Sequence, residues 1–203
     1  MGTCFDGQNG VVARCGGIIL TGGASLRMGR DKATIPSGGT TLAEQTARLL
    51  EQIAEPVVEV GPGVTHLPVV SESPPRAGPL AATVAGWRAL ADGGWDGPVI
   101  VVATDLPRLR LEVLDWLANH PAPGSIVPRS NGRPQSLCAR YAKEDLELAA
   151  QLVADGATAM RDLLAAAHPL VVDADWDGAL DDVDTPADLS AAGLLGPRIW
   201  PAK

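Results

Sequence analysis

The sequence has no apolar run near the roughly 20 residues that a membrane-spanning helix needs. Residues 1–14 contain glycine, asparagine, glutamine and aspartate in place of the apolar stretch of a signal peptide. We therefore expect a cytoplasmic protein without a membrane anchor, in which residues 1–14 form a loose tail. Residues 15–203 are expected to form a single domain, because no linker long enough to separate two domains interrupts them.

Cysteine and histidine are both scarce, with three of each in 203 residues. The cysteines are Cys4, Cys15 and Cys138. Their odd number, their scatter and the absence of a C-x-x-C pair predict free thiols in a reducing compartment. The histidines are His66, His120 and His168. Because they show no metal-ligand spacing, we interpret them as surface or loop residues.

Basic residues are outnumbered by acidic ones, 16 to 24, which gives a formal net charge of −8 at pH 7. Nucleic-acid backbones recruit basic surfaces, so this balance argues against a nucleic-acid partner. A small anionic ligand stays compatible with it, since such a ligand needs only a local basic site. The sequence is otherwise typical of a globular protein, with 46% hydrophobic and 20% charged residues.

Apolar periodicity predicts strands and helices in alternation. Strands are expected at 17–20, 57–60, 67–70, 98–103, 125–127, 136–141 and 169–172. Helices are expected at 42–54, from 79 through 90, around 111–117, at 143–153, at 157–167 and from 185 onward. This alternation predicts a three-layer α/β/α fold around a mostly parallel, Rossmann-like sheet. In such sheets ligands bind beyond the carboxyl ends of the strands.

The loop after the first predicted strand combines glycine with positive charge. It runs from Leu20 to Lys32 and reads L-T-G-G-A-S-L-R-M-G-R-D-K. Glycines let backbone N–H groups approach an anion, and the added charge of Arg27, Arg30 and Lys32 suits a polyphosphate. The G-x-G-x-x-G fingerprint of dinucleotide-binding proteins is absent. The G-x-x-x-x-G-K-[ST] pattern of a P-loop is absent too, because Gly29 is followed by Arg and Lys32 by Ala. Taken alone, the loop is better interpreted as a polar surface loop with turn glycines.

A second loop follows the most apolar predicted strand, at 98–103, and begins with Thr104 and Asp105. Mg²⁺ prefers carboxylate oxygens together with the phosphates of a substrate. Asp105 is thus a candidate ligand for the metal that bridges a triphosphate. The alternative is that Asp105 caps a turn before Pro107, which is a common role for aspartate.

Together these segments resemble a known family. The loop from Leu20 to Lys32 is similar to the L-A-G-G-x-S-x-R-M-G-x-D-K signature of molybdenum cofactor guanylyltransferases (MobA-like enzymes) and their cytidylyltransferase relatives. Further matching segments follow in the family's order at Gly78-Pro79-Leu80, Asp105-Leu106-Pro107, Gly132-Arg133-Pro134-Gln135-Ser136-Leu137 and Asp182-Val183-Asp184-Thr185-Pro186. The resemblance spans residues 16–192. Its first signature is long and specific, whereas the others are weak singly.

The resemblance implies a Mg²⁺-dependent nucleotidyltransferase that transfers GMP from GTP to molybdopterin and releases pyrophosphate. Other proteins of molybdenum cofactor biosynthesis are then candidate partners. The nucleotide-binding residues that it implies are Leu20, Thr21, Gly22, Gly23, Lys32, Glu72, Gly78, Pro79, Leu80 and Asp105. Lys32 would contact the phosphates with Arg27 reinforcing its charge, and these two residues with Asp105 would form the catalytic set.

The resemblance also implies an acceptor site. Asp182 and Asp184 would border the acceptor, and Asp184 could add to Asp105 as a second metal ligand. Gln135 would lie near the acceptor pocket, where a purely structural role is equally compatible with the sequence.

Several positions depart from the family's pattern. Thr21 replaces the usual Ala, Thr104 stands where Cys is common, and Ser136 replaces Pro. Asp182-Val183-Asp184 stands where the guanylyl branch often has Asn-x-Asn, and it is closer to the cytidylyl branch. CTP therefore stays open as the nucleotide. A sugar-phosphate or other small-acceptor nucleotidylyltransferase and a non-catalytic nucleotide-binding accessory protein are the further alternatives.

Overall fold

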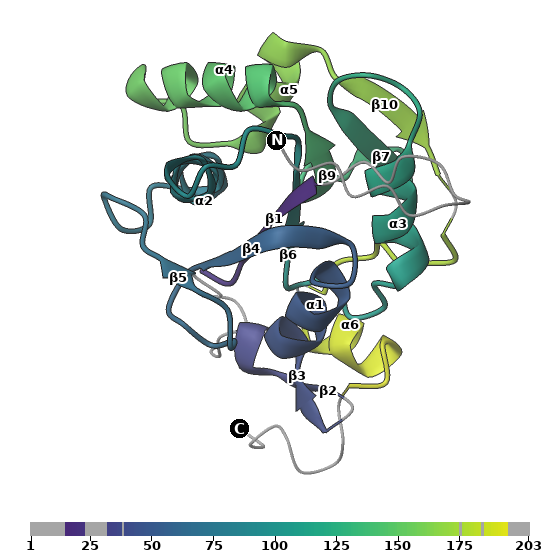
Figure 1. Ribbon diagram of the computed structural model, residues 1–203. Helices are drawn as coiled ribbons and strands as arrows, with labels where there is room; N and C mark the ends of the chain where they lie inside the picture. Colours follow the sequence, from purple (N-terminus) through teal and green to yellow (C-terminus); the bar gives the residue numbers. More distant parts are fainter. Residues whose placement is uncertain (1–14, 23–31, 38, 175, 184, 195–203) are drawn as a thin grey trace, which may run out of the picture.

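The computed structural model describes residues 15–22, 32–37, 39–174, 176–183 and 185–194 (Figure 1). The predicted tail, residues 1–14, lies outside these ranges. Within them, eight strands form one sheet in the order β10-β7-β9-β6-β1-β4-β5, with β8 paired to β7. A separate two-stranded hairpin is formed by β2 and β3.

The strands of the large sheet run mostly in one direction. They are β1 (Cys15–Leu20), β4 (Ala54–Val60), β5 (Val69–Val70), β6 (Val99–Ala103), β7 (Ile126–Ser130), β8 (Arg133–Pro134), β9 (Cys138–Tyr141) and β10 (Leu170–Asp173). The pairs β1–β4, β1–β6, β4–β5 and β7–β10 are parallel. Strand β9 is antiparallel to both β6 and β7, and β8 is antiparallel to β7. The mostly parallel sheet is thus confirmed, with two reversed strands, β8 and β9, whose direction hydropathy alone does not reveal.

Helices cover both faces of the sheet (Figure 1). They are α1 (Leu42–Leu50), α2 (Pro79–Asp92), α3 (Leu111–Asn119), α4 (Lys143–Ala154), α5 (Met160–Ala167) and α6 (Pro186–Ala191), with a short 3₁₀ helix η1 (Lys32–Thr34). The small hairpin consists of β2 (Pro36–Ser37) and β3 (Thr40–Thr41). Among the described residues, no helix is both long enough and apolar enough to cross a membrane.

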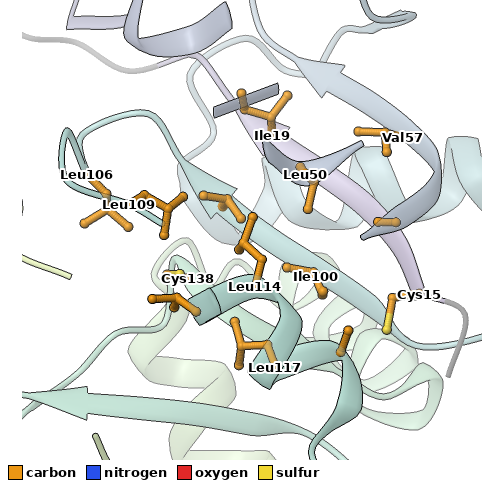
Figure 2. Close-up of a cluster of buried hydrophobic side chains, with 14 of the residues drawn as sticks. Cys15, Ile19, Leu50, Val57, Ile100, Leu106, Leu109, Leu114, Leu117 and Cys138 are labelled. Carbon is orange, nitrogen blue, oxygen red and sulfur yellow. The ribbon is translucent and has the colours of Figure 1, made fainter. Parts of the chain in front are cut away.

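A hydrophobic core lies between the sheet and the helices on each of its two faces. On one face, Ile19 and Ile100 of the sheet pack with Leu50 of α1, and Leu114 and Leu117 of α3 belong to the same cluster (Figure 2). The residues of the other core include Ile18, Val101, Leu80 of α2, Leu146 of α4 and Leu163 of α5. Every residue of β1 and β6 is buried, because both faces of these central strands are covered. The predicted three-layer α/β/α fold is confirmed.

Some predicted boundaries were wrong. Helix α1 begins as predicted, with the Thr41 hydroxyl accepting a hydrogen bond from the Glu44 amide, but it ends at Leu50 and not near 54. The reason is that Ala54 already pairs with Cys15 of β1. The strand predicted at 67–70 is limited to 69–70, the strand predicted at 136–141 begins at 138, and the helix predicted at 157–167 begins at 160. Helix α6 begins as predicted after Thr185, which caps it.

Candidate active site

The carboxyl edge of the sheet gathers most of the predicted site segments. Strands β5, β4, β1 and β6 are consecutive parallel neighbours, so their carboxyl ends meet at one edge. Glu72 follows β5, Thr21 and Gly22 follow β1, and Asp105 follows β6. Because β9 runs in the opposite direction, the segment that precedes it, with Gln135, lies at this same edge.

A pocket of about 120 Å³ lies at this edge. It is lined by Asp105, Leu106, Pro134, Gln135, Ser136, Leu137 and Asp182. The pocket therefore joins three segments that are far apart in the sequence. It brings the predicted metal ligand Asp105 together with two predicted acceptor residues, Gln135 and Asp182. Its carboxylates and its amide side chain offer oxygen atoms to a cation or hydrogen bonds to a polar ligand.

The wall that carries Asp182 is fixed by hydrogen bonds to two other loops. The Val183 amide donates to the Asp105 carbonyl oxygen at 2.9 Å. The Arg110 guanidinium donates to the Trp176 carbonyl oxygen at 2.8 Å, and the Asn131 side-chain amide donates to the Asp181 carboxylate at 2.9 Å. The segment 176–183 is thus held against the loop after β6 and the turn after β7.

The segment that carries Gln135 is also fixed by hydrogen bonds. The Gln135 amide donates to the Pro128 carbonyl oxygen at 2.8 Å, and the Cys138 amide donates to the Gln135 carbonyl oxygen at 3.0 Å. The buried Tyr141 hydroxyl donates to the Ser136 carbonyl oxygen at 2.7 Å. These bonds hold the backbone of the 135–137 segment, so the side chains of Gln135 and Ser136 project from a fixed frame.

A third, small core packs the segment after the glycine-rich loop against the segment that carries Asp182. Its buried residues are Ile35, Leu42, Val183 and Leu189. Ile35 lies three residues after Lys32, the first residue of η1, and Val183 lies next to Asp182. The chain that leaves the glycine-rich loop is therefore packed against the segment that forms the acidic wall. The side chain of Lys32 lies outside the described part of the chain, as do the predicted site residues Gly23, Arg27 and Asp184.

The start of the glycine-rich loop is bound to the protein itself. The Leu20 side chain is buried in the core that contains α2. The amides of Thr21 and Gly22 both donate to the Val60 carbonyl oxygen, at 3.1 and 3.4 Å. These two amides are therefore engaged within the protein, and Leu20 and Thr21 shape the base of the loop.

Glu59 is a functional candidate that the sequence reasoning missed. Its side chain is fully buried at the carboxyl end of β4, and its Oε1 atom accepts a 2.6 Å hydrogen bond from the Thr21 hydroxyl. Burial opposes ionisation, yet hydrogen bonds from the Thr21 and Thr65 hydroxyls and from loop amides hold the pKa of Glu59 below its ordinary value. The signal that could have revealed it is one acidic residue inside the apolar run Val57-Val58-Glu59-Val60.

The predicted nucleotide-binding segment 78–80 has close contacts of its own. Gly78 has a φ of +101°, and a Cβ atom there would lie 2.6 Å from the Thr158 carbonyl oxygen. Leu80 is fully buried, and its amide donates to the same oxygen at 3.3 Å. Pro79 is exposed at the first turn of α2, and the partly buried Glu72 accepts a hydrogen bond from the Arg76 amide. Pro79 and Glu72 are therefore open to a ligand, whereas the Leu80 side chain is not.

Cys138 lies close to the pocket, but its thiol is expected to be unreactive. Burial, with a smaller contribution from the negative charge of Asp105, raises the pKa of the Cys138 thiol to about 12. Both Cys15 and Cys138 are buried free thiols, as the sequence predicts.

The exposed His66 is hydrogen bonded to Glu44 and Glu51, in agreement with its predicted surface position.

Comparison with solved structures places the fold among nucleotidyltransferases. A molybdopterin-guanine dinucleotide biosynthesis protein A from Archaeoglobus fulgidus superposes with a TM-score of 0.69 at 20% identity, covering 87% of this chain and 95% of that one. A 2-C-methyl-D-erythritol 4-phosphate cytidylyltransferase from Thermus thermophilus superposes with a TM-score of 0.61 at 17% identity, covering 88% and 97%. At these identities the likeness concerns the fold alone, and proteins named for different bases share it.

Sequence comparison is more specific. A "probable molybdenum cofactor guanylyltransferase" from Mycobacterium avium is 36% identical over 184 residues, which cover 86% of this chain and 93% of the relative. A relative of the same name from Mycobacterium tuberculosis is 37% identical over 190 residues, which cover 89% and 92%. The pattern of the MobA-like NTP transferase domain matches residues 17–171. The chain therefore belongs to the family of MobA-like NTP transferases.

Proposed function

We propose that this protein transfers GMP from GTP to a molybdopterin-type cofactor and releases pyrophosphate. The observation that carries the proposal is the pocket at the carboxyl edge of the sheet, the edge at which the glycine-rich loop begins, where Asp105, Gln135 and Asp182 converge. The choice of GTP and of the acceptor rests on relatives named molybdenum cofactor guanylyltransferase that are 36% and 37% identical over most of their length.

The pocket fits a magnesium ion bound together with a triphosphate. Mg²⁺ in phosphate-transfer sites is held by one or two carboxylates, and substrate phosphates supply further oxygens. Asp105 and Asp182 supply two carboxylates to one pocket, and Asp184 is the next candidate along the chain. Among the described side chains, no group of three or more His, Cys, Asp or Glu residues is placed to hold a metal ion. When bound, the ion would neutralise phosphate charge.

The reaction is a direct displacement at phosphorus. An oxygen of the acceptor's terminal phosphate forms a bond to the α-phosphorus of GTP. The bond from the α-phosphorus to the oxygen that bridges to the β-phosphorus breaks, and pyrophosphate leaves with that electron pair. Lys32 and Arg27 would stabilise the charge on the leaving pyrophosphate, and Gln135 and Asp182 would orient the acceptor. A protein nucleophile is unnecessary for such a displacement.

CTP is the second candidate nucleotide. The observation that favours it is the Asp182-Val183-Asp184 sequence, whose first residue lines the pocket. This sequence resembles the cytidylyl branch more than the guanylyl branch. The fold does not decide between the two, since the cytidylyltransferase from Thermus thermophilus shares it. Other proteins of molybdenum cofactor biosynthesis are the proposed source of the acceptor.

The test has two stages. The first measures Mg²⁺-dependent thermal stabilisation by GTP, CTP, ATP and UTP at equal concentration, because a ligand that binds only the folded state raises the melting temperature. Selective stabilisation by GTP supports the proposal, and selectivity for CTP moves the protein to the cytidylyl branch. Stabilisation by none of the four would contradict the nucleotide site.

The second stage measures pyrophosphate release with molybdopterin and the selected nucleotide. Asp105→Asn should lose both the activity and its dependence on Mg²⁺. Asp92→Asn is the matched control, since Asp92 is exposed at the end of α2, and it should retain both. Equal activities of the two variants would refute the metal-binding role of Asp105.

A further inference from the structure

Glu59 and Thr21 face each other because of the register between two parallel strands. Ile19 of β1 is the partner of Glu59 in β4. Side chains alternate along a strand, so Thr21, two residues after Ile19, lies on the same face of the sheet as Ile19. The Thr21 hydroxyl donates to Glu59 at 2.6 Å, and Thr21 is only 3% exposed. This contact lies where the glycine-rich loop leaves the sheet.

The loop after β4, residues 61–68, surrounds the other side of the same carboxylate. The amides of Gly63, Val64 and Thr65 donate to Glu59 at 2.8, 2.9 and 2.9 Å. The Thr65 hydroxyl also donates to Glu59, at 2.6 Å. One buried carboxylate thus binds two loops, the glycine-rich loop through Thr21 and the 61–68 loop through four donors.

Gly61 lets the two loops touch. A Cβ atom at this position would lie 2.1 Å from the Thr21 hydroxyl oxygen and 2.8 Å from the Gly22 nitrogen, distances that atoms cannot adopt. Only glycine therefore permits the backbone after β4 to pass so close to the base of the glycine-rich loop. The hydrogen bonds from Thr21 and Gly22 to the Val60 carbonyl oxygen complete the same junction.

A buried polar network is a weak means of stabilising a fold, since apolar side chains in place of all its members often do as well or better. A fully hydrogen-bonded polar network instead fixes one arrangement of the groups that it joins. Here those groups are two loops at the edge where the nucleotide is proposed to bind. We propose that Glu59 is a positioning residue for nucleotide binding, which fixes Thr21 and Gly22, the start of the glycine-rich loop, through the Thr21 hydroxyl. This rests on the proposed function, because it assumes that the loop binds the nucleotide.

The test compares the two hydroxyl donors of Glu59. Thr21→Ala removes the donor from the glycine-rich loop, and Thr65→Ala removes an equivalent donor from the 61–68 loop. The dissociation constant for Mg²⁺–GTP and the melting temperature are measured for each variant. We expect Thr21→Ala to raise the dissociation constant about tenfold, the scale of one charged hydrogen bond. Thr65→Ala should change it by less than about twofold with a similar loss of melting temperature.

Thr21→Ser provides the rescue, because it restores the hydroxyl and should return the dissociation constant to within about twofold of the wild-type value. Alanine is the usual residue of the family signature at this position, so Thr21→Ala is expected to fold. Equal effects of Thr21→Ala and Thr65→Ala on GTP binding, or a failure of Thr21→Ser to restore it, would overturn the positioning role. A wild-type protein that binds none of the four nucleotides would overturn the proposed function too, and this is seen before any variant is compared.

Discussion

Arg140 allows the stability of the fold to be tested separately from the candidate active site. It is 6% exposed on β9, and its guanidinium donates to the carbonyl oxygens of Leu117, Ala118, His120, Ala122 and Gly124 at 2.7 to 3.3 Å. These carbonyls include the last ones of α3, which have no partner within the helix. One side chain therefore satisfies both the end of α3 and the loop that leads into β7.

Replacing Arg140 with methionine keeps much of the side-chain volume and leaves all five carbonyl oxygens without this donor. Each lost hydrogen bond costs about 1 kcal/mol, but the losses overlap, so we expect a decrease of about 3–5 kcal/mol in the free energy of unfolding. For a domain of this size that corresponds to about 10 °C in melting temperature. The measurement is urea unfolding followed by circular dichroism.

Arg161→Met is the matched control, because the Arg161 side chain is 87% exposed on α5. Its substitution should change the free energy of unfolding by less than about 0.5 kcal/mol. Arg140 pairs with Ile100 and Ile126, away from the carboxyl edge, so GTP binding by the folded variant should stay within about twofold of wild type. If Arg140→Met cost no more than Arg161→Met, water would be satisfying the carbonyls and the reasoning would be wrong.

Three further predictions concern the site, pH and the thiols. Lys32→Ala should lower turnover about 100-fold or more with little change in melting temperature. The control is Lys143→Ala, which loses only an exposed ion pair with Asp96 and should leave turnover unchanged. Equal turnover in both variants would refute the phosphate role of Lys32. Hydrogen bonds to Glu44 and then to Glu51 raise the pKa of His66. The stability that this contributes is present below the ordinary pKa of about 6.5 and is lost as pH rises through the raised value. His66→Gln should therefore flatten the dependence of melting temperature on pH near neutrality, and an unchanged profile would contradict the interpretation. Burial raises the pKa of Cys138 to about 12, so iodoacetamide at pH 8 should label this thiol only after unfolding. Mass spectrometry detects the label, and rapid labelling of the folded protein would show that the thiol is accessible.

The sequence predicts features that depend on neighbouring residues. The apolar run at 98–103 becomes a fully buried strand, and Thr41 and Thr185 cap the helices that follow them. Features that depend on distant residues were missed. The charge of Glu59 is accommodated by Thr21, 38 residues earlier, and the early end of α1 follows from the pairing of Ala54 with Cys15. Hydropathy reports whether a residue is buried but not which distant group meets it.

The site depends in the same way on a feature that periodicity does not contain, namely the direction of β9. The pattern of buried residues in β9 is the same whether the strand runs parallel or antiparallel to β6. Only the antiparallel direction observed here puts its first residue, Cys138, beside Val102 near the end of β6. Gln135 and Ser136 then reach the pocket that contains Asp105. In the parallel direction the residues after Tyr141 would lie at this edge, and Gln135 would lie at the opposite one. Predicting Gln135 near the acceptor therefore required the family resemblance, whereas Asp105 follows an apolar strand and could be placed at the ligand edge from local pattern alone.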